Sequence, residues 1–179
     1  ARRDLEELGV EVRTGTPVTE IAEGIAVVGE ERIATATMIW AAGVQASPAA
    51  RWLGVAPGRG GHVPVGADLT VPGHPEIYAI GDTAAHVPDG AGRPLPGVAP
   101  VAKQMGAYVG RRIARAAAGK PEGGPFRFRG RGKMATIGRN RAIAQMGRLR
   151  VSGFPGWTLW GLAHVYFLIG FRNRLAVLM

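Results

Sequence analysis

A short apolar segment that ends in Gly-Asp, residues 77–82, holds the side chains best suited to chemistry in this chain. An apolar run of this length predicts a buried strand, and Gly-Asp at its exit places a carboxylate at the carboxyl end of a sheet, where α/β proteins bind nucleotides and flavins. Gly81 lets a ligand approach the backbone, and Asp82 offers a charged acceptor to ligand hydroxyls. Taken alone, the segment fits equally well a strand end at which Asp82 caps a turn.

The sequence also predicts a helix from about residue 100 to residue 118. Pro100 suits a first helical position. An apolar face repeats every four residues, at Val101, Met105, Val109 and Ile113. The last turns carry arginines that complement the helix dipole, at positions 111, 112 and 115. A helix start has free N–H groups, so beside Asp82 it would face a flavin pyrimidine carbonyl while Asp82 holds the ribityl hydroxyls.

Other candidate motifs are weaker. Residues 37–41 predict a buried strand, and Ala42-Gly43 at its end forms a second place where a ring or ribose could lie against the main chain, or simply a tight turn. Residues 130–135 match G-x-G-x-x-A, but no βαβ unit surrounds them, so we reject a dinucleotide loop there. The histidines show no metal-ligand spacing. With no cysteine in the chain, thiolate catalysis and disulfides are excluded.

Charge divides the chain into two parts. It has 179 residues and a formal net charge of +9, yet residues 1–125 carry 12 basic and 13 acidic side chains. Residues 126–179 carry 10 basic side chains and no acidic one. The excess positive charge therefore lies in the last third and favours an anionic partner, either nucleic acid or a membrane surface.

The remaining elements follow from periodicity and turn residues. Near the N-terminus we expect a helix over residues 1–8 that stops at Gly9, strands at 10–13 and 18–21, and a hairpin of 25–28 with 32–34. In the last third, Arg and Lys at alternate positions predict two or three antiparallel strands with a cationic face. Residues 157–171 are apolar but shorter than a membrane span of about 20 residues, so they predict an interfacial helix or hairpin, with a buried core helix as the alternative.

Together these segments resemble the type II NADH dehydrogenases, single-subunit NADH:quinone oxidoreductases that pump no protons. The resemblance covers nearly the whole chain in family order, at residues 37–48, 68–75, 77–82, 99–106, 134–139 and 167–175. It implies an α/β fold, a C-terminal fragment of a flavoprotein with two Rossmann-like domains of the pyridine nucleotide-disulfide reductase type. The chain would hold the end of the NADH-binding domain, the return segment of the FAD-binding domain and a β-rich and helical membrane-associated region, at residues 1–60, 61–122 and 123–179.

The resemblance also implies roles by position. The FAD contacts would be Gly81, Asp82, Ala99, Pro100 and Val101. Ala42 and Gly43 would face the nicotinamide of NAD(H), and a quinone would bind near Pro100, Lys103 and Gln104. Many relatives have Ala-Gln where this chain has Ala99-Pro100, so one side-chain amide is missing from the expected quinone pocket. NADH would pass a hydride to FAD, which would pass two electrons to the quinone, and no side chain here need act as a general acid or base.

The implied partners are a quinone, an anionic membrane surface bound through residues 126–179, and a second copy in a homodimer, with no nucleic acid. The implied location is peripheral, on the cytoplasmic face of the cell inner membrane. A soluble FAD-dependent NAD(P)H reductase with a protein acceptor is an alternative, but it would not need the apolar run at 157–171. A sulfide:quinone reductase fits less well because that chemistry relies on cysteines. A cationic nucleic-acid-binding module lacks any recognisable motif.

Overall fold

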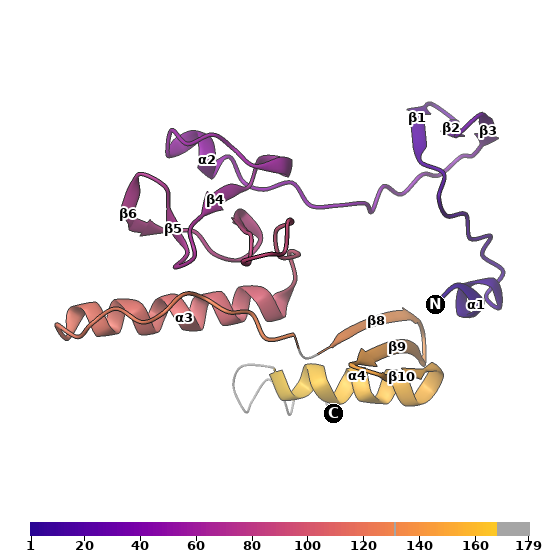
Figure 1. Cartoon of the computed structure of the whole chain (residues 1–179). Helices are drawn as coiled ribbons and strands as arrows, with labels where there is room; N and C mark the ends of the chain where they lie inside the picture. Colours follow the sequence, from indigo (N-terminus) through magenta and orange to yellow (C-terminus); the bar gives the residue numbers. More distant parts are fainter. Residues whose placement is uncertain (131, 168–179) are drawn as a thin grey trace. The chain divides into compact units, whose positions relative to one another are not determined.

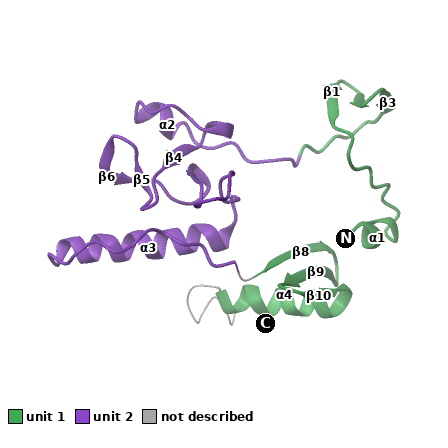
Figure 2. Cartoon of the chain, in the orientation of Figure 1, with its two compact units in different colours: residues 1–40, 131–179 green, residues 41–130 purple. Residues whose placement is uncertain are grey.

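The structure is a computed structural model that describes residues 1–130 and 132–167 and divides into two compact units (Figure 2). One unit contains residues 1–40 and the described part of residues 131–179. The other contains residues 41–130. The flavin-type motif lies in the unit of residues 41–130, and most of the basic C-terminal part belongs to the other unit.

The N-terminal part of the first unit is a short helix and a three-stranded antiparallel meander, α1 Arg2–Glu6, β1 Val18–Ala22, β2 Ile25–Val28 and β3 Glu31–Ala34 (Figure 1). The predicted hairpin is confirmed, because Val28 pairs with Glu31 across a two-residue turn in which Gly29 has φ of 65°. This positive φ is the conformation that glycine adopts without strain.

Two predicted strands in this region are wrong. Residues 10–13 have irregular backbone. Residues 37–41 also form no strand, and their large apolar side chains are solvent-exposed, with Ile39 at 86% and Trp40 at 64%. A strand needs a paired neighbour, and no strand in the described part of the chain pairs with this segment. The segment has the apolar composition of a buried strand, but the described residues provide no neighbouring strand to pair with it.

The C-terminal part of the first unit is a second antiparallel meander followed by a helix, β8 Lys133–Gly138, β9 Arg141–Met146, β10 Leu149–Ser152 and α4 Gly153–Phe167. The prediction of antiparallel strands is confirmed, but the cationic face is smaller than expected. Arg127 and Arg129 precede the sheet, while Arg139 and Arg148 lie in its two turns. Lys133 and Arg150 both pair with Gln145, so these three side chains form one row on one face.

Helix α4 packs on the opposite face of this sheet. Ala142 and Ala144 of β9 are buried on that face, and Gly156 is the buried residue of the helix. A stripe of side chains four residues apart points away from the sheet and is exposed: Phe154, Thr158, Leu162 and Tyr166. The helical interpretation of this apolar run is confirmed for the described residues, and the rest of the run, from residue 168, lies outside them.

The second unit is built from short strands and one long helix. Its elements are α2 Ala49–Trp52, the 3₁₀ turn η1 Arg59–Gly61, β4 Val63–Val65, β5 Thr70–Val71, β6 His74–Tyr78, the 3₁₀ turn η2 Gly81–Thr83, β7 Ala84–His86 and α3 Ala99–Ala117 (Figure 1). β4 pairs with β7 in parallel, and β5 pairs with β6 antiparallel. One apolar cluster joins α2 to the strands, and a second joins Leu69 to α3 and Phe126.

The strand predicted at residues 77–80 is displaced. β6 begins earlier and ends at Tyr78, its side chains are only half-buried or exposed, and Ile80 lies outside it with 39% exposure. The buried strand of this region is β7, where Ala84 and His86 point into the core. The apolar run thus leads into the turn η2 rather than forming the centre of a sheet.

Helix α3 confirms the predicted helix but corrects its buried face. Val101, Met105 and Val109 are buried as expected, whereas Ile113 is 54% exposed and Arg112 is buried instead. A strict four-residue step drifts about 40° per step around a helix, so after three steps the fourth position lies about 120° from the first. Eleven residues complete three turns to within about 20°, which places Arg112 on the face that Val101 begins.

Arg112 is buried at the centre of a polar cluster. Its Nη2 donates to Asp68 Oδ2 at 3.3 Å and to the Glu122 carboxylate, and its Nη1 donates to the Gly123 carbonyl at 3.1 Å. A hydrogen bond that Arg112 donates to Tyr78, outweighing the effect of burial, raises the pKa of Arg112 further above its ordinary value. Burial raises the pKa of Asp68, but hydrogen bonds from Thr70 and the Arg112 charge outweigh it, and the net pKa is lowered. The cluster therefore stays ionised and holds α3 to the chain that follows it.

Candidate functional site

The candidate site is the turn η2 where it packs on the first turns of α3. Gly81 has φ of 64°, and its N–H donates to Met105 Sδ at 3.3 Å. A Cβ at Gly81 would lie 3.3 Å from the Cβ of Ala102. Glycine is therefore required here twice, once by the backbone conformation and once by the close approach to the helix.

The carboxylate of Asp82 lies against the chain that enters α3. A Cβ added to Gly97 would come within 3.3 Å of both Cγ and Oδ1 of Asp82. The Asp82 side chain is exposed, and within residues 1–130 and 132–167 its carboxylate has no hydrogen-bond or ion-pair partner. A carboxylate acceptor is therefore available to a ligand close to the start of a helix.

The first turn of α3 provides the positive end of the helix dipole. Val98 is the N-cap and makes no side-chain cap, while its carbonyl accepts the N–H groups of Val101 at 2.9 Å and Ala102 at 3.2 Å. Pro100 occupies the second helical position rather than the predicted first, and it has no N–H to offer. Among the described residues the Ala99 N–H is thus a donor that remains at the helix start, and the dipole favours negative charge beside it.

The predicted FAD residues are brought together. Gly81 and Asp82 come from η2, and Ala99 and Pro100 are exposed on the first turn of α3. Val101 differs, because its side chain is only 2% exposed within the apolar cluster of α3. Buried there, the Val101 side chain packs in the core and presents almost no surface at the helix start.

The predicted nicotinamide residues stand apart from this group. Ala42 and Gly43 are exposed in irregular backbone, where Gly43 has φ of 76°. In the described part of the chain no hydrogen bond joins them to η2 or to the start of α3. The structure therefore neither assembles them with Asp82 nor gives them a defined pocket.

The predicted quinone residues lie on the first two turns of α3 with different surroundings. Pro100 and Lys103 are exposed. Gln104 is half-buried and both atoms of its amide are engaged, because Nε2 donates to the Arg129 carbonyl at 3.1 Å and Oε1 accepts the Arg129 N–H at 3.0 Å. Sequence reasoning missed this contact, since nothing local in either segment signals a pairing over 25 residues.

Sequence reasoning also missed Gly97 as a neighbour of Asp82. A signal existed, because Gly97 lies two residues before the helix begins, in a segment rich in Pro and Gly. A glycine at that place permits close approach of another group to the backbone. The Asp82 carboxylate therefore occupies space that a larger residue at position 97 would take.

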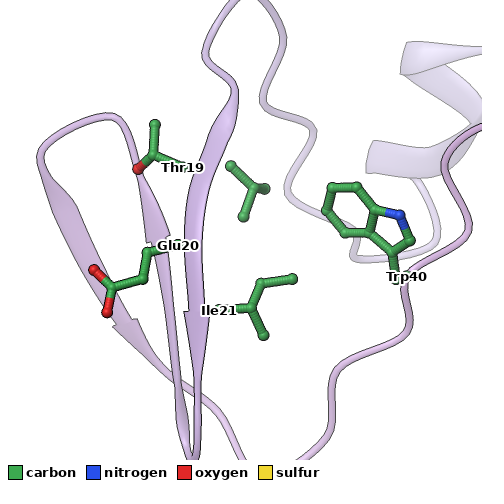
Figure 3. A pocket seen from close by; sticks show the side chains of 5 residues that line it. Thr19, Glu20, Ile21 and Trp40 are labelled. Carbon is green, nitrogen blue, oxygen red and sulfur yellow. The ribbon is translucent and has the colours of Figure 1, made fainter.

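A separate pocket lies in the first unit. It has a volume of about 260 Å³ and is lined by residues of β1 and by Trp40. Figure 3 shows the Trp40 indole facing the apolar side of the strand near Ile21, while Glu20 points away from it. The surface that faces Trp40 is thus apolar, and the pocket shows no constellation suited to catalysis.

The profile of the pyridine nucleotide-disulphide oxidoreductase family matches residues 1–106. The chain belongs to this family. The α/β fold class expected from the sequence is confirmed by that match.

Two curated relatives of this pyridine nucleotide-disulphide oxidoreductase chain come from Mycobacterium tuberculosis. The type II NADH:quinone oxidoreductase NdhA is 38% identical over 99% of this chain and 39% of its own length. The type II NADH:quinone oxidoreductase Ndh is 38% identical over 98% of this chain and 39% of its own length. The resemblance to the type II enzymes is confirmed, and the chain spans about two fifths of the length of these relatives.

A solved structure gives the same fold. NDH2 from Plasmodium falciparum, determined in complex with NADH, matches 97% of this chain and 51% of its own with a TM-score of 0.77. The sequence identity is 14%, so this likeness supports the fold of the oxidoreductase family and carries no information on ligands of this chain.

Proposed function

We propose that the whole protein is an FAD-dependent NADH:quinone oxidoreductase and that this chain supplies one side of its flavin site. The observation that carries the proposal is the 38% identity to type II NADH:quinone oxidoreductases over 99% of the chain. The Asp82 carboxylate beside the start of α3 supports the proposal independently. A carboxylate suits the hydroxyls of a ligand and a helix start suits a polar carbonyl, and FAD carries both groups.

The residues present fit FAD. Asp82 would accept hydrogen bonds from the ribityl hydroxyls, and Gly81 would let the cofactor lie against the turn. Ala99 and Pro100 would lie beside the ring, with the Ala99 N–H and the helix dipole directed at its negative end. FAD, when bound, would accept a hydride from NADH and deliver two electrons to the quinone. The protein would then orient the reactants, with Ala42 and Gly43 on the nicotinamide side and Pro100, Lys103 and Gln104 on the quinone side.

The domain assignment remains a proposal. Residues 1–60 would belong to the NADH-binding domain, 61–122 to the FAD-binding domain and 123–179 to the membrane-associated region. The packing of Phe126 in the α3 cluster, with 6% exposure, supports placing residues 123–130 with the FAD-binding part instead. The membrane-associated region would then begin close to β8.

Purified full-length protein provides the test of the proposed activity. We expect bound FAD and NADH oxidation coupled to reduction of a quinone, measured by absorbance at the NADH and quinone bands. A soluble redox protein supplied in place of the quinone should accept electrons poorly. Fast reduction of that protein together with no quinone reduction would refute the proposal and favour the soluble reductase.

The described residues include no helix that is both long enough and apolar enough to cross a membrane. We propose that the C-terminal region binds the membrane peripherally, on the cytoplasmic face of the inner membrane. The exposed stripe of α4 supports this, because Phe154, Leu162 and Tyr166 are 54–69% exposed together with Phe167. An apolar helix face with aromatic residues suits the bilayer interface.

Leu162→Glu tests this surface. Leu162 is 63% exposed, so the change should leave α4 packed on its sheet while it places a charge in the stripe. We expect binding of the full-length protein to phosphatidylglycerol-containing vesicles to weaken at least tenfold, since burial of a leucine contributes about 1.5–3 kcal/mol. Ala107→Glu on the exposed side of α3 adds the same charge and serves as the control. Equal loss of vesicle pelleting in both variants would argue against a role for the stripe.

A further inference from the structure

A strap, defined here as residues 121–130, runs along helix α3 without secondary structure of its own (Figure 1). Its backbone carbonyls are held by a ladder of α3 side chains, in which Arg115 donates to Pro121 at 2.9 Å, Arg112 to Gly123 at 3.1 Å, Tyr108 to Gly124 at 2.8 Å and Gln104 to Arg129 at 3.1 Å. These positions are three or four residues apart and therefore share one face of the helix.

The apolar side of the strap fixes its register. Phe126 is buried, with its ring edge-to-face against Tyr108 at 5.5 Å and His86 at 5.4 Å between centroids. Its N–H donates to the Ala67 carbonyl at 2.8 Å. A one-residue slip would expose this ring and break the ladder, so the position of Arg129 along α3 is set by the core.

The Gln104 rung differs from the others because it binds one strap residue twice. Its amide donates to the Arg129 carbonyl and accepts the Arg129 N–H, which fixes both position and orientation of that peptide. Gln104 lies four residues after Pro100, slightly more than one turn or about 6 Å along the helix. The backbone of Arg129 is thereby held one turn from the helix start where the ring and quinone are proposed to lie.

The Arg129 side chain itself is exposed, and no hydrogen bond or ion pair within residues 1–130 and 132–167 engages its guanidinium. A guanidinium is always protonated and offers several N–H donors on a long stem. Quinone oxygens are acceptors that gain negative charge on reduction, and Pro100 offers them neither an amide nor an N–H. An arginine held one turn from Pro100 would supply the hydrogen-bond donors that the quinone oxygens require.

We propose that Gln104 does not contact the quinone but is a positioning residue that holds Arg129 beside the start of α3, so that the Arg129 guanidinium supplies the polar contact to the quinone oxygens. The proposal rests on the proposed NADH:quinone oxidoreductase function. It reverses the role that the sequence resemblance implies for Gln104.

A double-mutant cycle in the full-length protein tests it, with Arg129→Ala, Gln104→Ala and the combined variant. Each single variant should raise the quinone KM about tenfold, the effect of a lost charged hydrogen bond, and leave the bound FAD and the rate of flavin reduction by NADH unchanged. The combined variant should be no worse than Arg129→Ala, because Gln104 acts through Arg129. Tyr108→Phe, which removes another rung of the ladder but keeps the ring, should leave the quinone KM unchanged.

Amide hydrogen exchange gives a readout independent of activity. Gln104→Ala should remove protection of the Arg129 N–H, whereas Arg129→Ala should retain it because the backbone contact survives. Additive effects of the two substitutions on the quinone KM would show that Gln104 contacts the quinone directly and would overturn the proposal, as would an unchanged Arg129 amide. Absence of quinone reduction by the unmodified full-length protein would instead overturn the proposed function, and the role of Arg129 with it. The exchange result would still decide whether Gln104 holds the backbone of Arg129.

Discussion

Replacement of Asp82 by alanine is expected to strip FAD from the full-length protein. The carboxylate is exposed, lies within reach of Gly97 at the helix start and has no partner in the described part of the chain, so its loss removes ligand contacts and little else. Hydrogen bonds to a charged group contribute about 1.5–3 kcal/mol each, so loss of two of them weakens FAD binding by about a hundredfold or more. Flavin absorbance per mole of purified protein measures the outcome.

Asp89→Ala is the matched control, since Asp89 is an exposed acidic residue seven positions along in a loop. It changes the net charge identically and should retain full flavin. Asp82→Asn keeps the shape and one acceptor oxygen but not the charge, so it should bind FAD with intermediate affinity. Undiminished yellow absorbance in Asp82→Ala after dialysis would remove Asp82 from the flavin site.

The site was predictable to the extent that it is local. Gly81-Asp82 and the start of α3 at Ala99 are separated only by β7 and the loop that follows it, and each carries its own signal in turn or helix chemistry. The structure brings them together as expected. The Gln104–Arg129 pairing was not predictable, because a glutamine amide on a helix face gives no indication of which distant backbone it will bind.

The fold shows the same division between local and distant causes. α3 follows from its own periodicity, and the error in its predicted buried face arises from counting in fours along a helix of 3.6 residues per turn. The run at 37–41 has the composition of a buried strand, but burial depends on a neighbouring strand, which composition cannot supply. Alternating arginines at 127 and 129 suggested a strand, yet the segment is fixed by the ladder on α3 instead.

The close approach of Gly156 to the sheet predicts a second large effect. A Cβ at Gly156 would lie 2.5 Å from the carbonyl oxygen of Ala142 and 3.2 Å from that of Val151. Both atoms belong to paired backbone of the sheet, so they cannot move without disturbing the strand pairing between β9 and its neighbours. Overpacking of this kind costs about 1–3 kcal/mol, which exceeds the gain of up to about 1 kcal/mol that alanine brings to a helix interior.

Gly156→Ala should therefore lower the free energy of unfolding of the C-terminal sheet and helix, while Gly161→Ala should raise it. Gly161 lies in the same helix, and a Cβ there meets no atom within 4 Å, so that substitution keeps the helix gain without the clash. Denaturant unfolding followed by tryptophan emission reports on this helix, because two of the four tryptophans, Trp157 and Trp160, lie in α4. If both substitutions stabilise the protein equally, α4 does not pack on β9 through Gly156, and the exposed stripe would then have to be assigned to another face of the helix.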